Sequence, residues 1–353
     1  MKKFKEIDNL FFDALKNEVF TGAAVLASKN GKVSFFETYG KTSAEGDKIT
    51  RETFFDLASL TKPLATTIFF QLLWQKKKIS PEDNVSYFYN EWKTDTYKKN
   101  IKISNLLLHD SGLPAHRKFY EKIQDIEFKF REKSRMDMIS KEALEHIPGS
   151  QTLYSDLGFM VLKYVLEKIA GESMYEYLKK NIYDYSESGL FFPSLKKSDC
   201  IKFCETSFSC FRNKRLTGEV NDENAFFIGG EDGHAGLFGN CMDINNLLRE
   251  IFCSYKGFKS CVLKSSCSRE ILKNRKNKRY YGFDITSKIE SSAGSFFTDK
   301  SPGHLGYTGT SFWMDLEKGL WIILLTNRVY YGDNNFKIKI FRPLLHDRLI
   351  NLV

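Results

Sequence analysis

The chain has 353 residues, of which 42% are hydrophobic, and its formal net charge is +9. This length and apolar content supply a core for one large domain or two closely packed ones, and they exclude a disordered chain. The basic residues form short, scattered runs such as Lys76-Lys77-Lys78 that do not alternate with aromatic side chains. We therefore expect a solvated, lysine-rich surface and no nucleic-acid partner.

The N-terminal residues begin basic but reach Glu6 and Asp8 before any apolar run of signal-peptide length, so no secretory signal is evident. The longest apolar runs fall short of the roughly 20 residues that a membrane helix needs. The seven cysteines are odd in number and lack a Cys-x-x-Cys pair. We expect a cytoplasmic protein with reduced cysteines and no membrane partner, and metal binding by Cys200, Cys204 and Cys210 is the less favoured alternative.

The hydrophobic pattern predicts strands near both ends of the chain and helices between them. The predicted helices cover residues 4–18, 59–73, 103–108, 157–169, 243–254 and 334–352. The predicted strands cover residues 23–28, 32–39, 280–285, 308–315 and 320–327, with 256–279 as connecting sequence. The first two strands flank Asn30-Gly31, a pair suited to a two-residue hairpin turn. The last predicted helix carries on one face Phe336, Ile340, Leu344 and Leu345.

This order of elements predicts a single α/β (α+β) domain over residues 1–353. Residues 1–62 and 280–353 are expected to contain an antiparallel sheet flanked by helices. Residues 63–279 are expected to form a mainly helical lobe inserted between these two parts. A cleft between the lobes would hold a ligand, and its walls are expected from the charged segment 117–146 and the glycine-dense segment 218–239.

Residues 55–63, Phe-Asp-Leu-Ala-Ser-Leu-Thr-Lys-Pro, place a serine three positions before a lysine at the predicted start of a helix. Residues at this spacing share a helix face, so the Lys62 amine should lie one turn from the Ser59 hydroxyl. A serine nucleophile needs a base within reach, and the free N–H groups of a helix start favour an oxyanion. A lone Ser-x-x-Lys is usually solvated surface, but the apolar neighbours Leu57 and Leu60 favour a site here.

Two histidines have competing interpretations. His109 precedes a Gly/Pro turn, where a structural role is favoured over a catalytic one. His234 lies in the most glycine-dense part of the chain, and the pattern leaves substrate contact and loop structure equally open.

Two further stretches follow Ser59-x-x-Lys62 in order: Tyr154-Ser155-Asp156 and Gly-His-Leu-Gly-Tyr-Thr-Gly at 303–309. Together the three resemble the Ser-x-x-Lys, Tyr-x-Asn and Lys-Thr-Gly motifs of the serine β-lactamase and penicillin-binding-protein superfamily. The resemblance is to the class C side, which includes esterases and D-amino-acid peptidases, and extends over about residues 20–330. It implies the β-lactamase/transpeptidase-like fold and a small-molecule ester, amide or β-lactam substrate, with no cofactor and no metal.

The resemblance also implies roles for individual residues. Ser59 would be the acylated nucleophile, Lys62 its proton partner, and Tyr154 the general base that later protonates the leaving group. The oxyanion site would combine the backbone N–H groups of Ser59 and Tyr307. Gly306 would let the strand edge approach the substrate without a side chain in the way.

Three residues depart from the family motifs. Asp156 replaces an amide and is expected to pair with Lys62 and hold it protonated. His304 replaces a lysine that attracts substrate carboxylates, and a largely neutral imidazole does so poorly. Leu305 replaces a hydroxyl residue. These changes argue against an efficient β-lactamase and favour hydrolysis of esters or small amides.

Two alternatives to this esterase or amidase remain. One is a D-alanyl-D-alanine carboxypeptidase-like peptidase, although its usual substrate lies outside the membrane and no export signal is evident. The other is a catalytically silent relative that uses the cleft for binding. The oligomeric state stays open.

Overall fold

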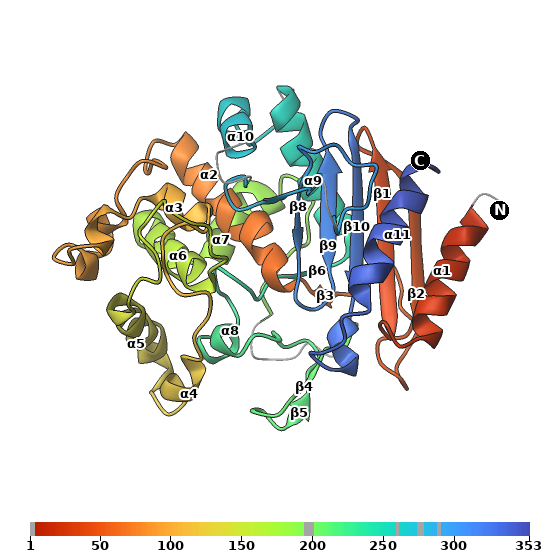
Figure 1. Ribbon diagram of the computed structural model, residues 1–353, viewed down its shortest axis with the longest axis horizontal. Helices are drawn as coiled ribbons and strands as arrows, with labels where there is room; N and C mark the ends of the chain where they lie inside the picture. The colour runs from red at the N-terminus through yellow and green to blue at the C-terminus, as the bar shows by residue number, and fades with distance from the viewer. Residues whose placement is uncertain (1–3, 194–200, 259–260, 274–278, 288–290) are drawn as a thin grey trace.

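The computed structural model describes residues 4–193, 201–258, 261–273, 279–287 and 291–353. In Figure 1 a twisted sheet with helices on both faces lies beside a mainly helical region. Within the described residues the sheet has six strands in the order β2-β1-β10-β9-β8-β7, with antiparallel neighbours throughout. Its strands are β1 (Gly22–Lys29), β2 (Lys32–Gly40), β7 (Asp284–Ile285), β8 (Pro302–Leu305), β9 (Ser311–Asp315) and β10 (Leu320–Thr326).

The two ends of the chain meet in the centre of this sheet, because β1 pairs with β10 from Ala23↔Thr326 to Lys29↔Leu320. The β1–β2 hairpin turns at Asn30 and Gly31, which have φ angles of 50° and 80°. An antiparallel sheet built from both chain ends is therefore confirmed, and with it the predicted fold class.

Helices cover both faces of the sheet, and the side chains of each strand alternate between the two layers. Ala23, Val25 and Ala27 pack in one apolar cluster with residues of α1 (Lys5–Lys16) and α11 (Ile338–Ile350). Ala24 and Leu26 belong to a larger cluster that includes α9 (Cys241–Lys256). Burial on both faces explains why all of β10, Leu-Trp-Ile-Ile-Leu-Leu-Thr, is apolar up to its last residue.

The helical region surrounds α2 and α6, which contact each other near the sheet. Its helices are α2 (Thr67–Gln75), α3 (Ile103–Leu107), α4 (Tyr120–Ile123), α5 (Phe128–Lys141), α6 (Asp156–Ala170), α7 (Met174–Leu178), α8 (Glu223–Phe227) and α10 (Ser265–Ile271). Two small strand pairs lie outside the six-stranded sheet: β3 (Phe55–Asp56) with β6 (Phe238–Gly239), and β4 (Phe208–Ser209) with β5 (Lys214–Arg215).

Several predicted boundaries are wrong. The helix predicted over 59–73 is divided into a 3-10 turn at Ala58–Leu60, a π-helical turn at Lys62–Thr66 and α2. Pro63 lies in the π-helical turn, where its missing N–H group disturbs the regular hydrogen-bond ladder. The strand predicted over 280–285 is reduced to β7, and α10 forms within sequence predicted to be connecting.

The apolar face predicted for the last helix is wrong for three of its four residues, and only Leu345 is buried as expected. Phe336 precedes α11 and is 53% exposed, while Ile340 and Leu344 are 72% and 44% exposed. The buried face is offset and carries Ile338, Phe341, Arg342, Leu345, His346 and Leu349. An arginine and a histidine on the buried face hide the apolar period from a reading of the sequence.

No helix among the described residues is long and apolar enough to cross a membrane. The six cysteines outside the undescribed segments form no disulfide. The metal site considered at Cys200, Cys204 and Cys210 involves a residue outside the described ones. Elsewhere in the described chain no cluster of His, Cys, Asp or Glu could hold a metal ion.

Candidate active site

Ser59 lies in a tight turn that follows the short strand β3. Ala58, directly before it, has a φ angle of +47°, which is unusual for a residue with a side chain. The buried carboxylate of Asp56 accepts the N–H group of Ala58 at 2.8 Å, and the N–H group of Leu57 bonds to the carbonyl of Leu237 at 2.9 Å. This bonding fixes the turn and presents Ser59 to a pocket of about 850 Å³.

Lys62 is fully buried directly beneath that turn. Its Nζ atom lies 3.2 Å from Ser59 Oγ, 2.8 Å from Asp156 Oδ1 and 3.1 Å from the carbonyl oxygen of His234. All three donors of the ammonium group are therefore engaged, one of them by the candidate nucleophile.

The Lys62–Asp156 pair controls the charges at the site. Burial works against the charge of Lys62, but Asp156 and Tyr154 outweigh it and raise the pKa of Lys62 above its ordinary value. Burial likewise opposes the charge of Asp156, yet Lys62 and His116 hold the pKa of that carboxyl well below its usual range. The expected pairing of Asp156 with a protonated Lys62 matches this geometry.

Tyr154 stands over Lys62, with its ring centroid 4.7 Å from Nζ, and it is 36% exposed to the pocket. Its ring also stacks on that of His109, with centroids 4.4 Å apart. Burial raises the pKa of Tyr154, and interactions with Lys62 and Ser59 oppose that rise. The phenol is thus the resting form of the residue.

The segment 154–156 is held by its neighbours. Ser155 caps α6 by accepting the N–H group of Gly158 at 3.3 Å, which starts the helix at Asp156. The backbone N–H group of Ser155 donates to His109 Nδ1 at 3.0 Å. His109 is therefore buried in the structural position that the sequence favoured for it.

The third stretch approaches Ser59 through two threonines. Thr308 Oγ1 donates to the carbonyl of Asp56 at 2.8 Å and Thr310 Oγ1 to that of Leu57 at 3.1 Å. A Cβ atom at Gly306 would come within 2.8 Å of the Leu57 carbonyl oxygen and 2.0 Å of Thr310 Oγ1, so only glycine fits. These contacts fix the 306–310 turn, which carries Tyr307, against the turn that carries Ser59, and both residues line the pocket.

His304 lies behind the site rather than on the wall of the pocket. It is 1% exposed, and its ring centroid is 6.0 Å from that of Tyr154. Its Nδ1 donates to the carbonyl of Leu305 at 2.9 Å, and burial lowers the pKa of His304 to about 4. The imidazole is neutral near pH 7, in line with the weak carboxylate attraction expected of it.

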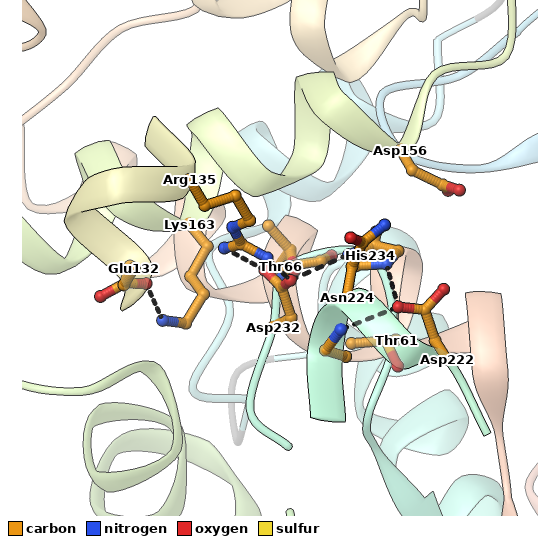
Figure 2. A network of polar contacts seen from close by, with 12 residues as sticks. Thr61, Thr66, Glu132, Arg135, Asp156, Lys163, Asp222, Asn224, Asp232 and His234 are labelled. Carbon is orange, nitrogen blue, oxygen red and sulfur yellow. Dashed lines mark hydrogen bonds and ion pairs between the residues drawn. The ribbon is translucent and has the colours of Figure 1, made fainter. Parts of the chain in front are cut away.

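His234 lies in a charged network that the sequence did not reveal (Figure 2). Its Nε2 is 2.9 Å from Asp222 Oδ1 and its Nδ1 is 3.2 Å from Asp232 Oδ2, and Asp232 forms a fully buried ion pair with Arg135. Burial opposes the charge, but the two carboxylates raise the pKa of His234 to about 10. The ring reaches the pocket wall, while the carbonyl of the same residue holds Lys62.

Further residues of the pocket carried no recognisable sequence signal. His116 Nδ1 lies 3.3 Å from Asp156 Oδ2, so Asp156 bridges Lys62 and His116. The hairpin β4–β5 contributes Ser207 to Phe211 to the pocket wall, where the ring of Phe211 contacts that of Tyr120 with centroids 5.0 Å apart. The predicted walls at 117–146 and 218–239 thus supply part of the pocket lining, and the hairpin supplies a wall that was not predicted.

Comparisons with known proteins identify the family of this chain. The family model described as "Beta-lactamase" matches residues 7–342. A protein described as "Putative D-alanyl-D-alanine carboxypeptidase" from Escherichia coli (strain K12) is 30% identical over 309 residues, covering 80% of this chain and 70% of that protein. The "N-acetylmuramyl-L-alanine amidase" of Bacillus subtilis (strain 168) is 28% identical over 365 residues, with 93% and 81% coverage.

Among solved structures, the fold is similar to that of "EstCE1, a hydrolase with promiscuous acyltransferase activity". The TM-score is 0.75 at 18% sequence identity, and the match covers 96% of this chain and 98% of that one. At this identity the match concerns the fold alone. The family match over nearly the whole chain confirms the resemblance noted from the three motifs, and the chain belongs to the beta-lactamase family of serine hydrolases.

Proposed function

We propose that the protein hydrolyses esters or small amides through an acyl-Ser59 intermediate. The observation that carries the proposal is the approach of Lys62 Nζ to Ser59 Oγ, 3.2 Å, beneath a pocket of about 850 Å³ that Tyr154 and Tyr307 also line. A hydroxyl and an amine three residues apart, and a phenol from a distant part of the chain, thus surround one position where a carbonyl carbon would bind.

In the proposed reaction Tyr154 is the proton carrier. Because Asp156 keeps Lys62 protonated, Lys62 is suited to stabilising a Tyr154 phenolate rather than to accepting a proton. In enzyme that has released the Tyr154 proton to solvent, the phenolate takes the Ser59 proton as Oγ attacks the carbonyl carbon, and the backbone N–H groups of Ser59 and Tyr307 stabilise the oxyanion. Tyr154 then protonates the leaving alcohol or amine. A water molecule, deprotonated by the same phenolate, releases the acyl group from Ser59.

The charges of the pocket favour substrates without a carboxylate next to the scissile bond. His304, at the position of the family lysine, is neutral and buried. The cations on the described wall are already paired: Lys118 lies 3.5 Å from Glu121, and His234 lies between two aspartates. A substrate carboxylate would therefore meet a single lysine among the described lining residues, Lys118, whose exposed ion pair with Glu121 is weak, and no lysine where the resembled motif has one.

The relatives support a second candidate, cleavage of a cell-wall peptide. Two of them are described as a D-alanyl-D-alanine carboxypeptidase and an N-acetylmuramyl-L-alanine amidase. An amidase that acts on a small muramyl-peptide amide remains compatible with the same acyl-Ser59 chemistry. Release of a terminal D-alanine requires binding its carboxylate, which the pocket supports less well.

The test is a pre-steady-state burst with p-nitrophenyl butyrate. We expect one equivalent of nitrophenol per active site in the initial phase for the natural chain and none for Ser59→Ala. Ser194→Ala is the matched control, because Ser194-x-x-Lys197 is the other Ser-x-x-Lys quartet of the sequence. A burst that survives in Ser59→Ala, or is lost only in Ser194→Ala, would overturn the assignment of the nucleophile.

Substrate class is tested in parallel with the same ester, a muramyl-L-alanine amide and a D-alanyl-D-alanine peptide. Turnover of the ester and of a muramyl-L-alanine amide, with slow or no release of D-alanine from a D-alanyl-D-alanine peptide, agrees with the charges of the pocket. Faster release of D-alanine than of p-nitrophenol would establish the carboxypeptidase alternative. Absence of any turnover with a well-folded protein would favour a silent binding protein.

A further inference from the structure

A second pocket, of about 840 Å³, lies between α11 and the chain that precedes β8. It does not share a described lining residue with the pocket at Ser59. Its lining combines two cations and several hydroxyl groups, including Lys339, Arg342, Ser291, Ser292 and Ser295, with apolar surface from Phe297.

Arg342 is the unusual member of this set. It is only 4% exposed, and no acidic side chain of the described residues forms an ion pair with its guanidinium group. Its Nη2 donates to the carbonyl of Gly309 at 3.1 Å, and its buried Nε has no hydrogen-bond partner. A buried cation without a counter-ion is costly, because desolvation is not offset by an opposite charge.

The titratable neighbours of Arg342 include another arginine, a neutral histidine and an exposed aspartate. Burial and the nearby Arg328 lower the pKa of Arg342 to about 10, so the group remains charged near pH 7. His346, one turn further along α11, is buried, and burial and Arg342 lower its pKa to about 3. His346 therefore adds no charge. Among the described lining residues Asp299 is the acidic one. It is exposed and has a contact of its own.

The loop that carries the serines is held firmly against α11. Asp347 Oδ1 accepts the N–H group of Ser295 at 2.6 Å. Gly294 has a φ angle of +79°, and a Cβ atom there would come within 2.2 Å of Asp347 Oδ1, so the close approach requires glycine. The hydroxyl groups of the loop are thus kept beside the helix face that carries Arg342.

We propose that this pocket binds a small organic oxyanion, a carboxylate or a phosphate monoester, with Arg342 as its principal charge partner. A planar guanidinium suits the paired oxygens of such groups, and charge-assisted hydrogen bonds of this kind are the strong ones. Lys339 and the serine hydroxyls supply further donors, and Phe297 supplies a face for an apolar substituent. The site is separate from the Ser59 pocket and does not depend on the acyl-enzyme chemistry.

The site lies directly behind the turn proposed to carry the oxyanion donor. Arg342 bonds to Gly309, and the N–H group of Gly309 bonds to the carbonyl of Gly306 at 3.0 Å. Tyr307 lies between these two glycines. A ligand that hydrogen-bonds to the Arg342 guanidinium therefore competes with the carbonyl of Gly309 and changes how the turn that carries Tyr307 is held. This makes the pocket a regulatory site for small anions.

Calorimetric titration of the full chain with phenyl phosphate and with benzoate, at constant ionic strength, tests the proposal. The two probes share a ring and differ in the oxyanion, and benzyl alcohol is the uncharged control. We expect saturable binding of at least one anion and none of benzyl alcohol. Arg342→Gln should weaken binding about tenfold to a hundredfold, the range of a charge-assisted hydrogen bond. Lys339→Gln should weaken it several-fold, and Arg348→Gln, on the same helix outside the pocket, should leave it unchanged.

Arg342→Gln removes a bond to Gly309 and its folding is checked by circular dichroism. If it does not fold, Lys339→Gln against Arg348→Gln decides, because Lys339 is exposed and its change leaves the core intact. Binding by the natural chain that Lys339→Gln weakens supports the site. Absence of saturable binding of both anions, or binding that Lys339→Gln and any folded Arg342 variant leave unchanged, would overturn it.

Discussion

Lys62 and Asp156 form an ion pair with Nζ and Oδ1 2.8 Å apart at the floor of the Ser59 pocket. The Tyr-x-Asn motif that this segment resembles has an amide at the position of Asp156, whereas this chain places a full negative charge there. The pair keeps Lys62 protonated and leaves Tyr154 to carry protons in the proposed reaction. The first prediction follows from that relationship.

Asp156→Asn should shift the pH dependence of kcat/KM toward lower pH. Asp156 raises the pKa of Lys62, so its removal lowers that pKa and stabilises the deprotonated form of the Lys62–Tyr154 pair at lower pH. An opposite charge at this distance is worth about one to three pKa units. The pH at which kcat/KM begins to rise should fall by that amount. The pH profile of p-nitrophenyl butyrate hydrolysis measures it. An unmoved or upward-shifted limb in a folded variant would contradict the role given to the pair.

His304→Lys should speed acylation by benzylpenicillin. A lysine at this position restores the cation that the family motif uses for the substrate carboxylate, whereas the present imidazole is neutral. We expect the second-order acylation rate to rise about tenfold or more, the effect of one charge-assisted hydrogen bond. His304→Gln is the neutral control and should show no gain. An equal gain in both variants would show that charge is not what limits the reaction.

Asp232→Asn should destabilise the fold by about 3–5 kcal/mol, because it leaves the buried Arg135 guanidinium without its partner. Both side chains of this ion pair are fully buried. The free energy of unfolding from urea titrations measures the loss. The matched control is Glu82→Gln, which breaks an ion pair with Lys102 on the exposed surface and should change nothing measurable. Similar losses of unfolding free energy in both variants would show that burial does not determine how much an ion pair contributes.

Stability should fall as the pH rises from neutral toward 10. Despite burial, Asp222 and Asp232 raise the pKa of His234 to about 10, well above its unfolded value near 6.5. The folded state therefore binds this proton more tightly than the unfolded state does. The resulting stabilisation is full below about pH 6.5 and is lost as the pH rises through the folded-state pKa of His234, about 10. Urea midpoints at a series of pH values measure the trend, which should be shallower in His234→Gln. An identical slope in the variant would exclude His234 as its source.

Much of the candidate site could be predicted because it depends on local spacing. Ser59 and Lys62 are close because they lie three residues apart in consecutive helical turns, and Gly306 is required by a close backbone approach. The pairing of Asp156 with Lys62 followed from charge once the motifs were aligned. The Arg135–Asp232 ion pair, to which His234 is added, joins residues 97 positions apart, and such a pairing leaves no periodic trace in the sequence.

The same reason explains the errors in the fold. The polar residues Arg342 and His346 occupy the buried face of α11, so the visible apolar period pointed to Phe336, Ile340 and Leu344, which are exposed. The hairpin β4–β5 has two-residue strands and gives no pattern long enough to recognise, yet it forms one wall of the pocket.

Acylation of Ser59 is tested most directly by the mass of the protein trapped during turnover of a slow acyl ester. We expect one added acyl mass, and peptide mapping should assign it to the peptide that contains Ser59. Ser59→Ala should abolish this added mass. Turnover without an added mass, or an acyl group mapped to any other residue, would contradict it.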